Sequence, residues 1–222
     1  MFNRVFAATT LILASVVCTQ TASAQYRVHY GYYQGSPPTD PTLAVYGGYM
    51  DMGHYVDGPL GTSVSGADAG LLGAQLTLPL SPNFALVANG AHSNSDLVFF
   101  VPAGGGPTIG NSEVWIFDGD LQLSAPFRGT GGHWVNPFLQ FGAGAMRYET
   151  QNTLGSASAT NFAFNVGGGL DYYLSRQVGL RVLAKDYIGH WSTPSAGYYN
   201  NGRYTDNFSI AAGFVVAFSG RR

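Results

Sequence analysis

Bulky and small residues alternate along the last stretch of the chain. In residues 208–218 the even-numbered positions are mostly large and apolar, while most of the odd-numbered positions are Ser, Ala or Gly. A period of two is that of a β-strand, whose successive side chains point to opposite faces. The pattern predicts a terminal strand with one bulky apolar face, ending on the aromatic ring of Phe218.

Seven earlier segments show a similar alternation, less cleanly in the first and the third. We expect strands near residues 42–52, 69–78, 84–94, 113–125, 137–149, 161–174 and 178–188. Short connections alternate with longer ones rich in Gly, Ser, Asn and Pro at 53–68, 95–112, 150–160 and 189–206. About ten residues per strand is the length that crosses a bilayer at a tilt. The pattern favours an all-β fold of four hairpins in a membrane.

The second face of the strands separates a membrane barrel from a soluble one. A soluble, ligand-binding barrel of the periplasm turns its bulky face inward and keeps its charges outside. Here the second face consists largely of Gly, Ala, Ser, Asn and Gln, with few charges. Such a face suits a lumen better than a surface in water, so we expect the bulky face to contact lipid.

The N-terminus has the features of an exported protein. Arg4 precedes an apolar run over residues 5–17, and Ala22-Ser23-Ala24 forms an A-x-A cleavage site. We expect four parts: a signal peptide (1–24), an N-terminal periplasmic arm (25–41), a β-barrel (42–218) and a short C-terminal tail (219–222). Beyond the signal, no apolar run approaches the ~20 residues of a spanning helix. A closed barrel is then the route through the membrane, because lipid offers no partner to an open strand edge.

Composition agrees with a lipid environment and argues against several other functions. Charged residues make up 10% of the chain and aromatic residues 14%, which fits strands in lipid with girdles of rings. A net charge of −2 without a basic run gives no electrostatic basis for nucleic-acid binding. The single cysteine, Cys18, lies in the signal, and His29, His54 and His133 are isolated. We therefore expect no disulfide, no metal site and no cofactor.

Three segments carry a family resemblance. Residues 165–175 (NVGGGLDYYLS), followed by 178–181 (VGLR), resemble the sixth and seventh strands of small OmpA/OmpX-type outer-membrane barrels. Residues 137–144 (PFLQFGAG) resemble the fifth strand. The resemblance implies an eight-stranded antiparallel up-and-down transmembrane barrel, monomeric, in the outer membrane of the Gram-negative cell envelope. It also implies recognition by the outer-membrane assembly machinery through Phe214 and Phe218, although residues 219–222 follow the aromatic on which the family usually ends.

Charged residues on the predicted inner face form a candidate lumen network. They are Asp118, Asp120, Asp171, Arg181 and Lys185. Such charges could line a conduction path or fill the lumen with ion pairs, and an eight-stranded barrel is only wide enough for side chains. We expect the filled lumen. A three-residue turn at 175–177 sets Asp171 opposite Arg181, within reach of an ion pair.

One motif points to chemistry. Some eight-stranded outer-membrane barrels are lipid A deacylases with a His-x-Ser pair on the final hairpin, and His190-Trp191-Ser192 resembles that arrangement. The family also uses a nearby Glu, but Glu113 and Glu149 lie on other segments. The other interpretation is an interfacial Trp191 between polar loop residues. We expect a non-enzymatic barrel with a structural or adhesion-like role, four external loops and an unknown external ligand. A lipid A hydrolase and a soluble ligand-binding barrel are the alternatives.

Overall fold

The computed structural model describes residues 40–52, 54–57, 63–100, 108–129, 133–152, 155–190 and 204–218. They form eleven strands: β1 Thr42–Met52, β2 His54–Asp57, β3 Ser63–Gly66, β4 Ala69–Pro79, β5 Phe84–Phe100, β6 Thr108–Ser124, β7 Phe127–Arg128, β8 Trp134–Asn152, β9 Gly155–Tyr173, β10 Val178–His190 and β11 Tyr204–Ala217. These residues include no helix that is long and apolar enough to cross a membrane.

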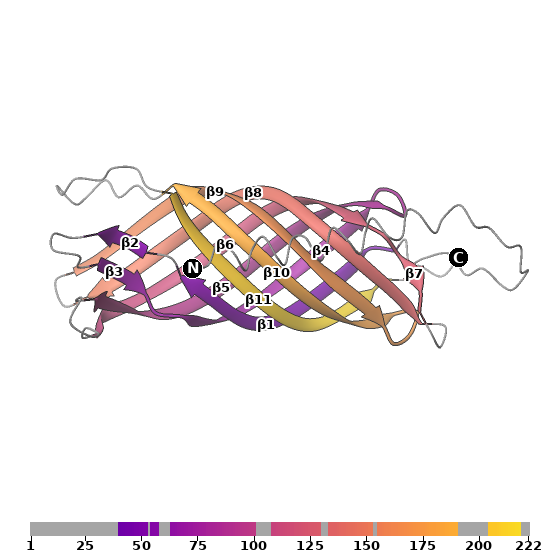
Figure 1. Ribbon diagram of the computed structural model, residues 1–222, viewed down its shortest axis with the longest axis horizontal. Helices are drawn as coiled ribbons and strands as arrows, with labels where there is room; N and C mark the ends of the chain where they lie inside the picture. The colour runs from indigo at the N-terminus through magenta and orange to yellow at the C-terminus, as the bar shows by residue number, and fades with distance from the viewer. Residues whose placement is uncertain are drawn as a thin grey trace, which may run out of the picture. The chain divides into compact units, whose positions relative to one another are not determined.

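Eight of the strands close into a barrel (Figure 1). Each wall strand pairs antiparallel with its neighbours in the order β1-β4-β5-β6-β8-β9-β10-β11, and β11 pairs with β1 to complete the ring. The hairpin of β2 and β3 prolongs the wall at one end, and β7 pairs with the start of β8 at the other. Closure leaves no wall strand with an open edge, as lipid requires.

The pairing register gives the size of the barrel. One row of paired residues starts at Met52 on β1 and returns to β1 at Thr42, a shear of ten residues. The row is Met52, Asn207, Tyr187, Asn165, Gly142, Asp120, Val87, Thr77 and Thr42. Eight strands with this shear tilt by about 41° and lie about 8 Å from the axis. Such an interior holds side chains and little else.

Bulky side chains face outward on every wall strand, as the alternation predicts. On β11, Phe208, Ile210 and Phe214 are exposed, whereas Ala211 and Val215 are buried in the lumen. The structure also shows which face of the first and third expected strands, β1 and β5, points into the lumen. The lumen-facing side chains are at even-numbered positions of β1 and at odd-numbered positions of β5. A soluble barrel with its bulky face inside, one of the alternatives, is wrong for this chain.

Most strands are longer than the sequence pattern indicates. β5 continues to Phe100, β8 and β9 have 19 residues each, and the expected loop at 53–68 contains β2 and β3. At a rise of about 2.5 Å per residue along the axis, roughly ten residues cross the apolar core of a bilayer. The additional residues prolong the wall beyond it at the end that carries the long connections. We call this the outer end, since long loops of such barrels are extracellular.

Aromatic rings mark two levels on the exterior. Six exposed rings lie at about the same height near the outer end: Tyr49, Trp115, Phe117, Phe162, Phe164 and Phe208. Phe84, Tyr172 and Phe218 lie roughly 22 Å below them along the axis, counted from the register. This separation matches an apolar band of about 25 Å bounded by aromatic girdles.

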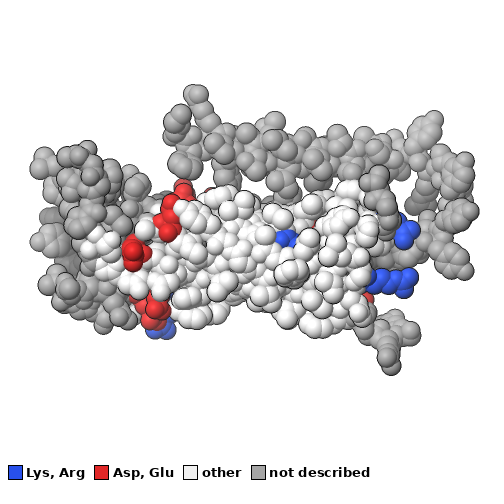
Figure 2. Space-filling model, turned by 90° about the horizontal axis from the view of Figure 1, so that it is seen from below, with Lys and Arg blue, Asp and Glu red and all other residues white. Residues whose placement is uncertain are grey.

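Charges on the exterior are few between the ends of the barrel. The face in Figure 2 has a belt almost free of charge, with acidic residues and a basic one at the outer end and basic residues at the other end. The outward-facing acidic residues near the outer end are Asp51, Asp68, Asp96, Glu113, Glu149, Asp206 and the half-buried Asp186, which is paired with Phe208. They lie at or just beyond the outer ring of aromatics, where a bilayer meets water.

Val182 of β10 tests whether the even-numbered positions of this strand face lipid. Its side chain is 51% exposed in the middle of the belt. Val182→Arg should lower the free energy of unfolding by about 2–4 kcal/mol, because it places a cation against the lipid midplane. Val182→Leu, the control, should change it by less than about 1.5 kcal/mol. The measurement is the loss of the fast-migrating folded band on unboiled gels against urea. Equal stabilities for the two variants would contradict the outward phase.

Candidate functional site in the barrel lumen

The candidate lumen charges all lie inside the barrel. Asp118 and Asp120 project from β6, Asp171 from β9, and Arg181 and Lys185 from β10. Each is at most 8% exposed, and they are the charged residues buried among those that the structure describes. Their positions follow from strand alternation, because each occupies an inward position of its strand. They form two groups at different depths.

The inner group is the pair of Arg181 and Asp171. Arg181 Nε donates to Oδ1 of Asp171 at 2.7 Å, and Nη2 donates to Oδ2 at 2.9 Å, a bidentate geometry. The two residues are directly opposed across β10 and β9, in the register predicted from the 175–177 turn. The guanidinium also lies 4.9 Å from the ring centroid of Phe138, within the range of a cation–π contact.

Glutamines carry this polar layer to the opposite wall. Arg181 Nη1 donates to Oε1 of Gln75 at 2.8 Å. Gln75 lies within 3.4 Å of Gln140, whose Nε2 donates to Oε1 of Gln122 at 2.9 Å. The sequence analysis did not single out these three glutamines as a set. Their common signal is an inward position in the alternation of their strands, β4, β6 and β8.

The second group lies nearer the outer end. Lys185 Nζ donates to Oδ1 of Asp118 at 2.6 Å and to Oδ2 of Asp120 at 2.7 Å. Asn89 donates to Oδ2 of Asp118 at 2.6 Å and accepts a hydrogen bond from the Tyr46 hydroxyl at 2.6 Å. A fully buried lysine is thus held by two carboxylates from one strand.

Glycines on the inner face of β8 and β9 make this contact possible. β6 and β10 are separated by these two strands, so the acidic side chains and Lys185 must reach across them. A methyl group at Gly142 would overlap Oδ1 of Asp120, and one at Gly167 would lie 2.5 Å from Cγ of Lys185. The Gly-rich inner faces are therefore the space in which the charged side chains lie.

The outer half of the lumen contains an apolar cluster, which the sequence analysis did not predict. Met50 and Met146 come from opposite walls and lie at about the same level by the register. Ile116, Leu71 and Tyr148 belong to the same buried cluster. Flexible methionine side chains fill irregular space well. Water entering from the outer end meets this cluster before it reaches a charge.

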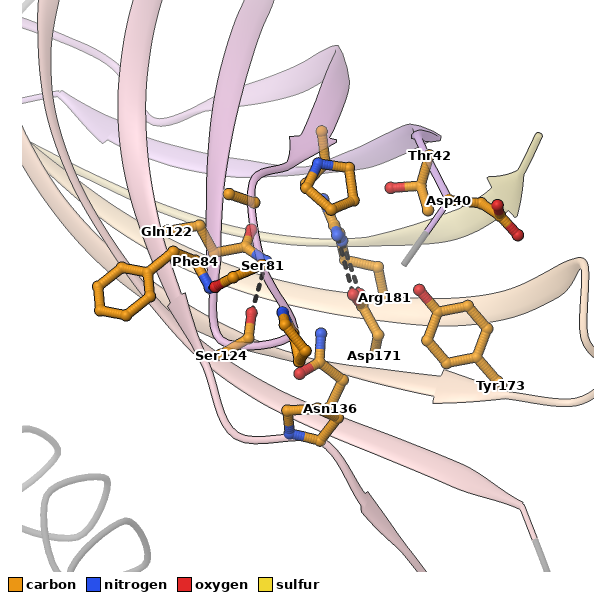
Figure 3. A pocket seen from close by; sticks show the side chains of 15 residues that line it. Asp40, Thr42, Ser81, Phe84, Gln122, Ser124, Asn136, Asp171, Tyr173 and Arg181 are labelled. Atoms are coloured by element: carbon orange, nitrogen blue, oxygen red, sulfur yellow. Dashed lines mark hydrogen bonds and ion pairs between the residues drawn. The ribbon is translucent and has the colours of Figure 1, made fainter. Parts of the chain in front are cut away.

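A small cavity opens at the inner end of the lumen (Figure 3). Its volume is about 40 Å³, enough for roughly three water molecules. The Arg181–Asp171 pair lines it, together with Thr77 and Asn136. Thr77 Oγ1 and Asn136 Oδ1 are buried without a protein partner, so water in the cavity would satisfy them. The cavity is too small for a larger ligand.

The architecture has counterparts among solved structures, although no protein-family model and no curated protein matches the sequence. Neisserial surface protein A is 12% identical with a TM-score of 0.54, over 80% of this chain and 96% of that one. OprG from Pseudomonas aeruginosa is 14% identical with a TM-score of 0.53, over 82% and 98%. The outer membrane protein AlkL is 15% identical with a TM-score of 0.50, over 89% and 99%.

This chain has the fold of the small outer-membrane β-barrels. At these identities the likeness shows the fold alone, and it confirms the OmpA/OmpX-type architecture expected from the strand motifs. The fold and the uncharged exterior belt together place the chain in an outer membrane.

The remaining candidate residues are not brought together by the described structure. His190 is the last residue of β10 and is paired with Tyr204, and Ser192 lies outside the described residues. Glu113 and Glu149 oppose each other on β6 and β8. Within the described ranges, no three His, Cys, Asp or Glu side chains are grouped as metal ligands. Phe214 and Phe218 are 62% and 52% exposed, and their part in assembly stays a prediction.

The buried pair predicts a non-additive double-mutant cycle. Arg181→Ala leaves the Asp171 carboxylate without a partner in a confined lumen, and it should cost about 3–5 kcal/mol of unfolding free energy. The double variant Asp171→Asn, Arg181→Ala should be more stable than Arg181→Ala alone, because it removes the unpaired charge. Urea unfolding of the refolded barrel in detergent measures both. If the losses of unfolding free energy for Asp171→Asn and Arg181→Ala add up to that of the double variant, the two residues are not coupled.

Proposed function

We propose that this protein is a non-enzymatic, non-conducting outer-membrane barrel that carries four connections at the cell surface in a structural or surface-contact role. The observation that carries the proposal is the filled lumen. The bidentate Arg181–Asp171 pair, the Lys185 cluster and the apolar outer cluster occlude the lumen at three successive levels. A pathway for solutes would need all three to move.

The outer end supports a role in surface contact. The connections of the four hairpins that leave the wall there lie around residues 58–62, 101–107, 153–154 and 191–203. The last of these contains Trp191, Tyr198 and Tyr199 among Ser, Gly and Asn residues, a composition typical of adaptable binding loops. Neisserial surface protein A, whose name describes a surface protein, has the same fold.

The lipid A hydrolase is the second candidate. By the register, the backbone of His190 lies near the level of the outer aromatic ring, where the acyl chains of an outer leaflet meet their headgroups. Ser192 follows two residues later. This placement near the leaflet is what favours the candidate.

Conductance tests the filled lumen. The purified barrel, inserted in a planar bilayer, should produce no stable unitary conductance steps, because side chains occupy the lumen at three levels. A porin inserted under the same conditions is the positive control. Reproducible steps of one size from the wild-type protein would overturn the proposed non-conducting state.

Labelling on intact cells tests the surface connections. A peptide tag inserted between Ser195 and Ala196 should bind antibody on intact cells, because that segment follows the outer end of β10. The same tag inserted after Arg176, in the short turn, should bind only after permeabilisation. The reverse result would mean that the barrel has the opposite orientation, and the proposed surface role would fail.

Mass analysis of lipid A separates the two candidate functions. Cells that express the protein should contain the same lipid A as cells with an empty vector. Loss of one acyl chain on expression, with the chain restored by Ser192→Ala, would replace our proposal with the hydrolase. The Trp191→Phe variant is the control, since it keeps both candidate catalytic residues.

A further inference from the structure

The described lumen contains more acid than base. Three carboxylates and two cations are buried there. Arg181 and Asp171 balance each other through two direct hydrogen bonds. The excess negative charge therefore belongs to Asp118 and Asp120, which share the single ammonium of Lys185. An uncompensated charge in such surroundings is costly, and proteins usually neutralise it.

The four carboxylate oxygens of this pair are not equivalent. Asp118 Oδ1 accepts from Lys185 and Oδ2 accepts from Asn89, while Asp120 Oδ2 accepts from Lys185. Asp120 Oδ1 has no hydrogen-bond partner, although the residue is only 4% exposed. A buried carboxylate oxygen without a donor is the unusual feature of this cluster.

A second unpartnered group lies in the same row of the register, two strands away. Asn165 is 5% exposed, and neither its Oδ1 nor its Nδ2 has a hydrogen-bond partner. In the register, Gly142 is opposed by Asp120 on one side and by Asn165 on the other. Asp120 Oδ1 lies over Gly142, in the space that a side chain would take. The two unpartnered groups thus face the lumen from the two sides of a residue that has no side chain.

We propose that the Asp118–Asp120 pair binds one proton, held on Oδ1 of Asp120, in the folded barrel at neutral pH. The proton removes the excess charge and leaves Lys185 with one ionised partner. It also turns Oδ1 from a buried acceptor without a donor into a hydroxyl group that can itself donate. A proton needs no space, and the cavity at the inner end is lined by Arg181 and Asp171 but not by Asp118 or Asp120.

The groups around the pair offer no other source of positive charge. β10 contributes Lys185 and the Tyr187 hydroxyl, β5 contributes Asn89, and β1 contributes the Tyr46 hydroxyl. Arg181 lies in the next layer and makes two hydrogen bonds to Asp171 and one to Gln75. Within the described part of the lumen, Lys185 is thus the one cation that contacts the pair.

The site makes stability depend on pH with a defined sign. In the unfolded chain an aspartate loses its proton at about pH 4. Above that pH the folded barrel binds one proton more than the unfolded chain, so its stability falls as pH rises, until the folded pair also loses the proton. One such proton changes the folding equilibrium by up to tenfold per pH unit. The barrel should therefore be more stable in mild acid than in alkali.

Two identical chemical changes test the assignment. Asp120→Asn mimics the neutral carboxyl, so at pH 8 its thermal midpoint in detergent should equal or exceed that of the wild type. Asp171→Asn breaks a balanced pair, and its midpoint should fall at both pH 5 and pH 8. From pH 5 to pH 8, the thermal midpoint of the wild type should fall more than that of Asp120→Asn. Equal losses for the two variants at pH 8, or parallel pH dependence of wild type and Asp120→Asn, would overturn the proposal.

Infrared spectroscopy gives a readout that does not depend on a variant that folds. The wild-type barrel in deuterated buffer at neutral pD should show the stretching band of a protonated carboxyl group, and no such band would overturn the proposal. Where Asp120→Asn folds, the band should disappear.

Replacing Na⁺ by N-methylglucamine at constant ionic strength should not change the thermal midpoint of the wild type. A specific stabilisation by Na⁺ that Asp120→Asn abolishes would assign the site to a metal ion instead.

Discussion

Within lipid, each backbone amide and carbonyl group needs a partner inside the protein, and the pairing of β11 with β1 completes that set here. The closure sets the dimensions of everything inside. Eight strands and a shear of ten residues place the wall about 8 Å from the axis. At that radius, side chains from opposite walls meet, so the lumen is a packed core. The exterior, which meets lipid, can be apolar all round without aggregating.

The narrow lumen explains why its charges are paired as they are. A long side chain such as Lys185 reaches a partner on a distant strand only if the strands between have no side chains in its way. The inward glycines of β8 and β9 meet that condition. Arg181 needs no such space, because its partner is directly opposite on the neighbouring strand. The two ion-pair groups thus use different solutions to the same constraint.

The barrel is divided along its axis as well as across its wall. The buried charges and glutamines lie nearer the inner end of the lumen than the methionine-containing apolar cluster, which shares the outer half with buried polar residues such as Ser93, Asn161 and Asn207. The exterior has an uncharged belt between aromatic levels, with acidic residues at the outer end. The wall continues past the outer aromatic level at the end that carries the long connections. These features favour a rigid support for surface segments over a passage for solutes.

The sequence alone determined the architecture, the outward face of most strands and the opposition of Asp171 to Arg181, because a period of two and a three-residue turn are local properties. It did not determine how far the strands continue, because pairing with a neighbour holds polar segments such as 150–152 in strand form. The contact of Lys185 with Asp118 and Asp120, the unpartnered Oδ1 of Asp120 and the apolar outer lumen also depended on the tertiary structure. These features join strands that are not neighbours, and only the shear of the closed barrel decides which of their residues lie at the same level.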